Sequence, residues 1–212
     1  MKLLLTSFGI TNDSIANVFD SLTGLDKNVV KIGFVPTASN VEDGNKSWFF
    51  KQIFDLQNRG YKWIDVIDFS ATDVDWQKRL NYCDVIYVSG GNTFHLLNQA
   101  KIHGFDTWLK DNIENKVYVG SSAGSILLTP TIQIASVEPA DTNHANITDL
   151  SALNFVPFEI SPHSPEQLSF EINETYAKTI SNKLYAIDDN TAIKVVNNNV
   201  EIITEGTWRE FN

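Results

Sequence analysis

The sequence predicts an α/β fold, with a doubly wound, mostly parallel sheet and helices on both faces. Short apolar runs alternate with longer amphipathic segments through the first two thirds of the 212 residues, and each run ends at a small residue or a turn signal. Strands separated by helices are joined by right-handed crossovers, which makes them parallel. Hydrophobic residues make up 42% of the chain and charged residues 20%, which is enough apolar material for a full core. We therefore expect a single α/β domain over residues 1–212.

Five apolar runs are expected to form the parallel strands. They are Leu3–Phe8, Lys31–Pro36, Trp63–Phe69, Val85–Ser89 and Val117–Val119. Two segments between them, Ser47–Asn58 and Thr93–Ala100, space their apolar residues as amphipathic helices do. Ligands of open α/β sheets bind beyond the carboxyl ends of the strands, so the loops after Ser89 and Val119 are the places to look for a site.

The pattern changes near the C-terminus. Ala192–Val196 and Val200–Thr204 are typical of two short strands, and the triplet Asn197-Asn198-Asn199 separates them. Asparagine tolerates the left-handed conformation that a tight turn requires. An antiparallel hairpin is therefore expected at the edge of the parallel core.

The chain is acidic and has one cysteine. Its formal net charge of -10 repels phosphate backbones and anionic lipid, so we expect neither nucleic acid nor a membrane surface as a partner. Cys83 alone excludes an intramolecular disulfide, and a reducing cytoplasm fits best. The opening apolar run is too short for a signal segment, and no run approaches the ~20 apolar residues that cross a bilayer. A cytoplasmic protein is expected, as a monomer or homodimer.

The fifth predicted strand runs into the segment Gly120-Ser121-Ser122-Ala123-Gly124. This matches G-x-S-x-G, in which the glycines permit a sharp turn from strand to helix that exposes the central serine. Ser122 is the candidate nucleophile. Its place at a helix N-terminus adds free backbone N–H groups that suit an anionic intermediate. The alternative is a tight turn with a capping serine.

The fourth predicted strand runs into Gly90-Gly91-Asn92-Thr93. Two glycines let the backbone approach a bound group and turn its N–H groups toward it. We assign one oxyanion-hole donor to the N–H of Gly91 and the other to that of Ala123, and we place Gly90, Asn92 and Thr93 at the substrate. The alternative, which is compatible with this assignment, is a helix start capped by Asn92 or Thr93.

A serine nucleophile needs a base, and His163 is the best of the four histidines. It follows the apolar run Phe155–Ile160 and lies between Pro162 and Pro165, which restrict its loop. The other three histidines are expected at a helix end, in a polar loop and on a pocket wall. They are His103, His144 and His95, respectively.

The acid that orients the imidazole is expected in the segment after Tyr185-Ala186-Ile187, where Asp188 and Asp189 are adjacent. Adjacent residues on a strand point to opposite sides, so only one of the two can face the histidine. Asp189 is our choice, with Asp188 as the alternative.

Taken together and in order, these segments resemble the peptidase E family of serine peptidases, family S51, which also contains the cyanophycinases. The resemblance rests on Ser89–Phe94, Gly120–Gly124, Asn154-Phe155 with Ser161-Pro162-His163, and Ile187–Ala192. It implies a fold similar to class I glutamine amidotransferases. It also implies Ser122 as nucleophile, His163 as general base and an acid at Asp189, with backbone N–H groups from Gly91 and Ala123.

Two features of the sequence depart from that family. Its members commonly have Glu at the position of Asp189. Members that cleave after an N-terminal aspartate have basic residues shortly after the histidine, whereas Ser164–Phe170 contains none. The only arginines are Arg59, Arg79 and Arg209. An arginine fork is the best partner for a carboxylate, so its absence argues against acidic substrates.

The sequence thus predicts a serine peptidase that acts on dipeptides or short peptides without a metal or organic cofactor and without a strict requirement for N-terminal Asp. A non-catalytic binding or sensor domain on the same fold and a cyanophycinase-like hydrolase are the alternatives. A glutamine-amidotransferase-like enzyme is a weaker one, because such enzymes have a cysteine at the elbow and Cys83 lies before a strand.

Overall fold

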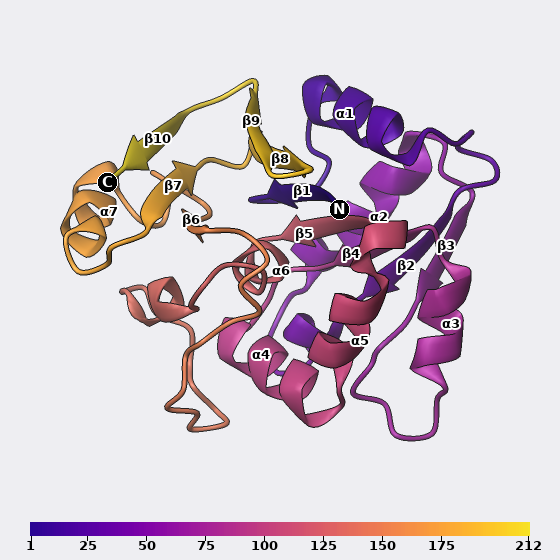
Figure 1. Ribbon diagram of the computed structural model, residues 1–212, viewed down its shortest axis with the longest axis horizontal. Helices are drawn as coiled ribbons and strands as arrows, with labels where there is room; N and C mark the ends of the chain where they lie inside the picture. The colour runs from indigo at the N-terminus through magenta and orange to yellow at the C-terminus, as the bar shows by residue number, and fades with distance from the viewer.

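The computed structural model describes residues 1–212, and its main feature is a seven-stranded sheet in the order β3-β2-β4-β5-β1-β8-β9 (Figure 1). The five strands of the N-terminal part are parallel, whereas β8 runs antiparallel to β1 and β9 antiparallel to β8. The bounds are β1 Lys2–Thr6, β2 Lys31–Val35, β3 Trp63–Val66, β4 Val85–Val88, β5 Val117–Ser121, β8 Thr191–Val196 and β9 Asn199–Thr204. The predicted α/β sheet and its antiparallel edge are thereby confirmed.

Helices cover both faces of this sheet, as a doubly wound arrangement requires. On one face lie α1 (Asp13–Thr23) and α2 (Ser47–Asn58), above a core of 16 buried residues. On the other lie α3 (Trp76–Tyr82), α4 (Thr93–Ile102) and α5 (Phe105–Asn112), which share a core of 38 buried residues (Figure 1). The remaining helices are short: α6 Ala123–Ile126, α7 Phe170–Ala177 and the 3-10 turns Thr37–Ser39, Ile113–Asn115 and Gln133–Ser136.

A second, three-stranded sheet lies beside the first, at the left of Figure 1. It has the order β10-β7-β6, with β6 (Phe158–Ser161) parallel to β7 (Lys183–Ile187) and β10 (Trp208–Phe211) antiparallel to β7. Buried residues of both sheets belong to the larger core, so the two sheets are packed together. The segments that leave β6 and β7 reach the carboxyl ends of β1 and β5, where the candidate site lies.

The ends of the predicted elements shift by a few residues, and the second sheet was not predicted. The third strand ends at Val66 rather than Phe69, and the fifth continues to Ser121. The hairpin turn is as expected, since Asn197 and Asn198 have φ of 49° and 69°. Two of the three strands of the second sheet have only four residues, so their alternation is too brief to stand out. No helix has the length and apolar character that crossing a bilayer demands.

Candidate active site

Ser122 occupies a strained turn between β5 and α6. Its φ and ψ are 51° and -114°, a conformation that costs a residue with a side chain about 1–3 kcal/mol. The glycines on either side make the turn sterically feasible: a Cβ on Gly120 would lie 2.7 Å from the backbone of Gly124, and one on Gly124 would lie 2.2 Å from the carbonyl oxygen of Val88. The backbone N–H of Ser122 donates to the carbonyl oxygen of Thr6 at 3.0 Å, which fixes the turn against β1.

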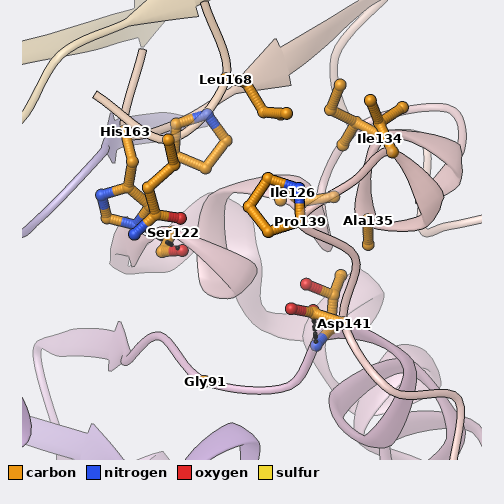
Figure 2. A pocket seen from close by; sticks show the side chains of 13 residues that line it. Gly91, Ser122, Ile126, Ile134, Ala135, Pro139, Asp141, His163 and Leu168 are labelled. Carbon is orange, nitrogen blue, oxygen red and sulfur yellow. Dashed lines mark hydrogen bonds between the residues drawn. The ribbon is translucent and has the colours of Figure 1, made fainter. Parts of the chain in front are cut away.

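His163 lies beside this turn, and its two ring nitrogens contact two different residues, Ser122 and Asp189. Its Nε2 is 3.0 Å from Oγ of Ser122, and its Nδ1 is 2.6 Å from Oδ1 of Asp189 (Figure 2 shows the imidazole beside the serine). His163 follows β6 and Asp189 follows β7, so the parallel pairing of these two strands brings both residues to the same end of the small sheet. The N–H of Ser164 donates to the carbonyl oxygen of Ile187 at 3.0 Å and ties the two segments together. The structure thus brings Ser122, His163 and Asp189 into one hydrogen-bonded chain.

Ser7, which the sequence analysis did not single out, contacts both Asp189 and His163. Its buried hydroxyl donates to Oδ1 of Asp189 at 2.7 Å and accepts from the backbone N–H of His163 at 2.8 Å. Burial raises the pKa of the Asp189 carboxyl, but the hydrogen bonds and charge of His163 and the hydrogen bond from Ser7 outweigh it and leave that pKa below its ordinary value. Asp189 is therefore held as a carboxylate. Ser7 follows β1, at the sheet edge where parallel strands end, and this position is the signal that could have found it.

Asp188 has a different environment from its neighbour. It is 6% exposed and accepts from the hydroxyl of Thr191 at 2.6 Å and from the backbone N–H groups of Asn190 and Thr207 at 3.0 and 2.6 Å. These bonds hold the connections between β7 and β8 and between β9 and β10. Of the two acids that the sequence left open, Asp189 is the one that contacts His163.

The loop after β4 passes close to Ser122. Gly91 has φ of 130°, and a Cβ there would lie 2.4 Å from the carbonyl oxygen of Ala38, so only glycine fits. Across from it, Ala123 is the first residue of α6, and the N–H of a first helical residue has no partner within the helix. Gly91 and Ala123 thus both lie beside Ser122.

The residues next to Gly91 have two different roles: Gly90 and Thr93 line cavities at Ser122, and Asn92 caps helix α4. Gly90 and Thr93 each line one of the two cavities at Ser122. Asn92 lines neither: its Oδ1 accepts from the N–H of His95 at 2.8 Å as the cap of α4, and its amide donates to the carbonyl oxygen of Thr142 at 2.9 Å. The structure therefore gives Asn92 the capping role, which is compatible with its predicted place at the substrate.

Two cavities meet at Ser122, and Gly91, Asp141, His163 and Gln167 line both of them. One has a volume of about 60 Å³ and is lined in part by the apolar side chains of Ile126, Ile134 and Leu168 (Figure 2). The other has a volume of about 350 Å³ and is lined by aromatic, amide and carboxylate side chains of residues including Trp48 and Glu42. The serine is thus accessible to a ligand in either cavity.

The other histidines lie outside these cavities. Nε2 of His103 contacts Oε1 of Gln99 at 3.1 Å at the end of α4, as the helix-end prediction has it, and His144 is exposed in its loop. His95, expected on the pocket wall, lines neither cavity. No group of three or more His, Cys, Asp or Glu side chains is arranged to hold a metal ion.

Comparison with known proteins agrees with the resemblance that the motifs predict. The family model described as peptidase family S51 matches residues 3–203. The chain belongs to peptidase family S51. Its S51 relatives include an uncharacterized peptidase of Pasteurella multocida, 32% identical over 201 residues that cover 90% of this chain and 93% of that protein. Peptidase E of Nostoc is 34% identical over 144 residues, which cover 66% of this chain and 54% of that protein.

Two solved structures share the fold of this chain. A crystal structure of a Listeria monocytogenes protein, provisionally described as peptidase E, superposes with a TM-score of 0.80 at 27% identity, covering 97% of this chain and 98% of that one. A peptidase from an acI-B1 actinobacterium has the same fold, with a TM-score of 0.62 at 19% identity. Membership in S51 makes the protein a peptidase, and the geometry around Ser122 is the basis for the finer proposal below.

Proposed function

We propose that this peptidase is of the serine type and hydrolyses dipeptides or short peptides through an acyl-enzyme. The observation that carries the proposal is the continuous hydrogen-bonded chain in which His163 lies 3.0 Å from Oγ of Ser122 and 2.6 Å from Asp189. These distances lie within the range that proton transfer between a nucleophile and its base requires.

In the first half of the reaction, Nε2 of His163 takes the hydroxyl proton of Ser122 as Oγ attacks the carbonyl carbon of the scissile peptide bond. The carbonyl oxygen becomes an oxyanion between the N–H groups of Gly91 and Ala123. His163 then gives its proton to the nitrogen of the leaving amine, and the C–N bond breaks. The acyl group remains on Ser122 as an ester.

In the second half, water replaces the amine. His163 takes a proton from the water as its oxygen attacks the ester carbon, and it returns that proton to Oγ of Ser122 when the ester bond breaks. The carboxylate of Asp189 stabilises the imidazolium that forms in both halves, and it keeps Nδ1 in the role of donor. The enzyme is restored and the product leaves as a carboxylic acid.

The substrate needs no N-terminal aspartate, because no cation is placed to bind its side chain. Neither cavity is lined by a lysine or an arginine. The three arginines have other partners: Arg59 pairs with Asp13, Arg79 pairs with Asp65, and Arg209 lies 4.2 Å from the ring centre of Phe170. A buried carboxylate without a cation is costly, so an acidic side chain gains nothing at this site.

Hydrolysis of a dipeptide library by the purified protein tests this proposal. We expect turnover of several dipeptides with neutral N-terminal residues, and its loss in Ser122→Ala. The exposed Ser136 provides the matched control, and Ser136→Ala should retain full activity. Equal turnover by Ser122→Ala, or a strict requirement for N-terminal aspartate, would contradict the proposal. A protein that binds dipeptides but hydrolyses none would favour the non-catalytic alternative.

A further inference from the structure

The larger cavity at Ser122 carries negative charge that nothing in the protein neutralises by direct pairing. Glu42 and Asp141 both line it, and neither takes part in a salt bridge. Asp189 lies at its edge and is paired with His163. Oδ2 of Asp141 accepts the backbone N–H of Thr93 at 2.7 Å, but neither the carboxylate of Asp141 nor that of Glu42 is paired with a cation of the protein.

The floor of the same cavity holds a buried hydroxyl without a partner. Ser121 is fully buried, lines the cavity, and its Oγ makes no hydrogen bond. Side chains alternate along β5, and Val119, two residues earlier, packs in the core under α2. Ser121 therefore points to the α2 side, where the buried Gln52 also lines the cavity. A buried polar atom without a partner is uncommon in a folded protein, and it indicates that a ligand completes this site.

We infer that this cavity binds the basic side chain of a lysine or arginine residue of the substrate. The cationic end would lie between the carboxylates of Glu42 and Asp141, and the hydroxyl of Ser121 would accept one of its N–H groups. The aromatic rings of Phe8 and Trp48, which also line the cavity, suit the methylene stem of such a side chain and attract its charge. The inference rests on the proposed function in that the bound group belongs to a peptide positioned at Ser122.

The surroundings of Glu42 agree with a site that binds a cation. Burial raises the pKa of its carboxyl, and the negative charge of Asp141 raises it further. The charges of His144 and Lys46 and a hydrogen bond from the side chain of Asn92 oppose these effects without reversing them. Lys46 does not neutralise the carboxyl by contact, because its ammonium group donates to the carbonyl oxygen of Ser39 at 2.7 Å. A bound cation would relieve the repulsion between the two acids.

Size assigns the long side chain to this cavity rather than to its neighbour. The cavity beside Ile126 has a volume of about 60 Å³ and the one beside Trp48 about 350 Å³, so the second has more room for a long side chain. Its dimensions and aromatic walls also exceed what a bare amino terminus would need. Binding of the amino terminus alone is therefore the rival that the experiment has to separate.

Calorimetric titration of the Ser122→Ala protein with amino-acid amides makes that separation without depending on catalysis. The probes are the amides of lysine, arginine, norleucine and aspartate. Norleucine has the carbon chain of lysine and keeps the α-ammonium group, but it lacks the side-chain ammonium group and its charge. We expect lysine and arginine amides to bind on the order of tenfold more tightly than norleucine amide, and aspartate amide to bind most weakly.

Two substitutions locate the effect. Glu42→Gln in the same background should lower the affinity for lysine amide on the order of tenfold and narrow its advantage over norleucine amide. The exposed neighbour Asp43 does not line the cavity, so Asp43→Asn should keep the wild-type preference. Circular dichroism should show that the variants remain folded. If Glu42→Gln does not fold, Asp141→Asn replaces it as the test variant.

The inference is overturned if norleucine amide binds as tightly as lysine amide, which would assign binding to the amino terminus. It is also overturned if lysine amide does not bind, or if Asp43→Asn changes the preference as much as Glu42→Gln. Because binding is measured without turnover, these outcomes are separate from a failure of the peptidase proposal, which concerns hydrolysis by the protein with Ser122 intact.

Discussion

The hydroxyl of Ser7 lies 2.7 Å from Oδ1 of Asp189, the same oxygen that faces Nδ1 of His163. The hydroxyl also accepts the backbone N–H of His163, so one buried side chain orients both the acid and the base. Ser7 and His163 thus hold the same oxygen of the Asp189 carboxylate from two directions.

Replacing Ser7 by alanine should impair turnover more than binding. The loss of one hydrogen bond to a carboxylate costs about 1.5–3 kcal/mol, so we expect kcat to fall by about one to two orders of magnitude with KM little changed. Steady-state kinetics on a dipeptide substrate measures both. Ser7→Thr keeps the hydroxyl and should restore much of the rate. A Ser7→Ala protein with unchanged kcat would remove Ser7 from the account.

Asp189 and Asp188 form a matched pair for substitution by asparagine. Asp189→Asn should lower kcat by about four orders of magnitude, because the amide favours the wrong tautomer of His163, and should leave the fold intact. Asp188→Asn should instead lower the thermal midpoint, because Asp188 accepts three hydrogen bonds that hold neighbouring segments together. Kinetics together with thermal melts distinguishes the two. The reverse pattern would make Asp188 the acid.

The buried carboxyl of Glu159 should make the stability of the protein depend on pH. It is fully buried on β6 and accepts from Thr131 and Asn182 through Oε1, while its Oε2 has no partner. Burial raises the pKa of this carboxyl above its ordinary value despite those hydrogen bonds. The folded state therefore favours the protonated form. The contribution of the protonated Glu159 carboxyl to the stability of the fold is complete below the ordinary pKa of glutamate, and it is lost as the pH rises through the pKa of the folded state.

Glu159→Gln mimics the protonated form at every pH. We expect the variant to melt a few degrees above wild type at pH 8 and close to wild type at pH 4. Thermal melts monitored by circular dichroism across this range test the expectation. A variant that is less stable than wild type at pH 8 would show that the charged carboxylate is needed.

Gly124→Ala tests the steric reason for the motif around Ser122. A Cβ there would lie 2.2 Å from the carbonyl oxygen of Val88, so α6 would have to move away from β4. Overpacking of this kind costs about 1–3 kcal/mol, and the displaced helix would also misplace Ser122. We expect a lower unfolding midpoint and reduced activity together. Wild-type stability and activity in this variant would show that the turn does not depend on close packing.

The sequence predicted most of the large sheet because its signals are local. Alternating strands and helices indicate parallel crossovers, and the paired asparagines at Asn197 and Asn198 indicate the hairpin. The convergence of Ser122 and His163 was predicted from motifs in a fixed order. The choice between Asp188 and Asp189 depended on which side chain faces inward, which adjacent residues on a strand do not reveal.

The second sheet and the acidic cavity could not be predicted in the same way. The order β10-β7-β6 pairs strands that are far apart in the chain, and no local pattern encodes that pairing. Ser7 and Glu42 are ordinary polar residues in sequence, and they acquire a role only because β1 and the segment before α2 end beside Ser122. Asn92 lies in the predicted oxyanion loop, and the contacts that make it the cap of α4 likewise become visible only in the structure.

The central claim is that Ser122 is the nucleophile, and covalent labelling tests it most directly. In a fluorophosphonate, the oxygen of an activated serine displaces fluoride from phosphorus and forms a stable ester. Intact-protein mass spectrometry should find one adduct per chain, peptide mapping should place it on Ser122, and Ser136→Ala should label like wild type. Labelling that persists in Ser122→Ala, or an adduct on another residue, would contradict the account.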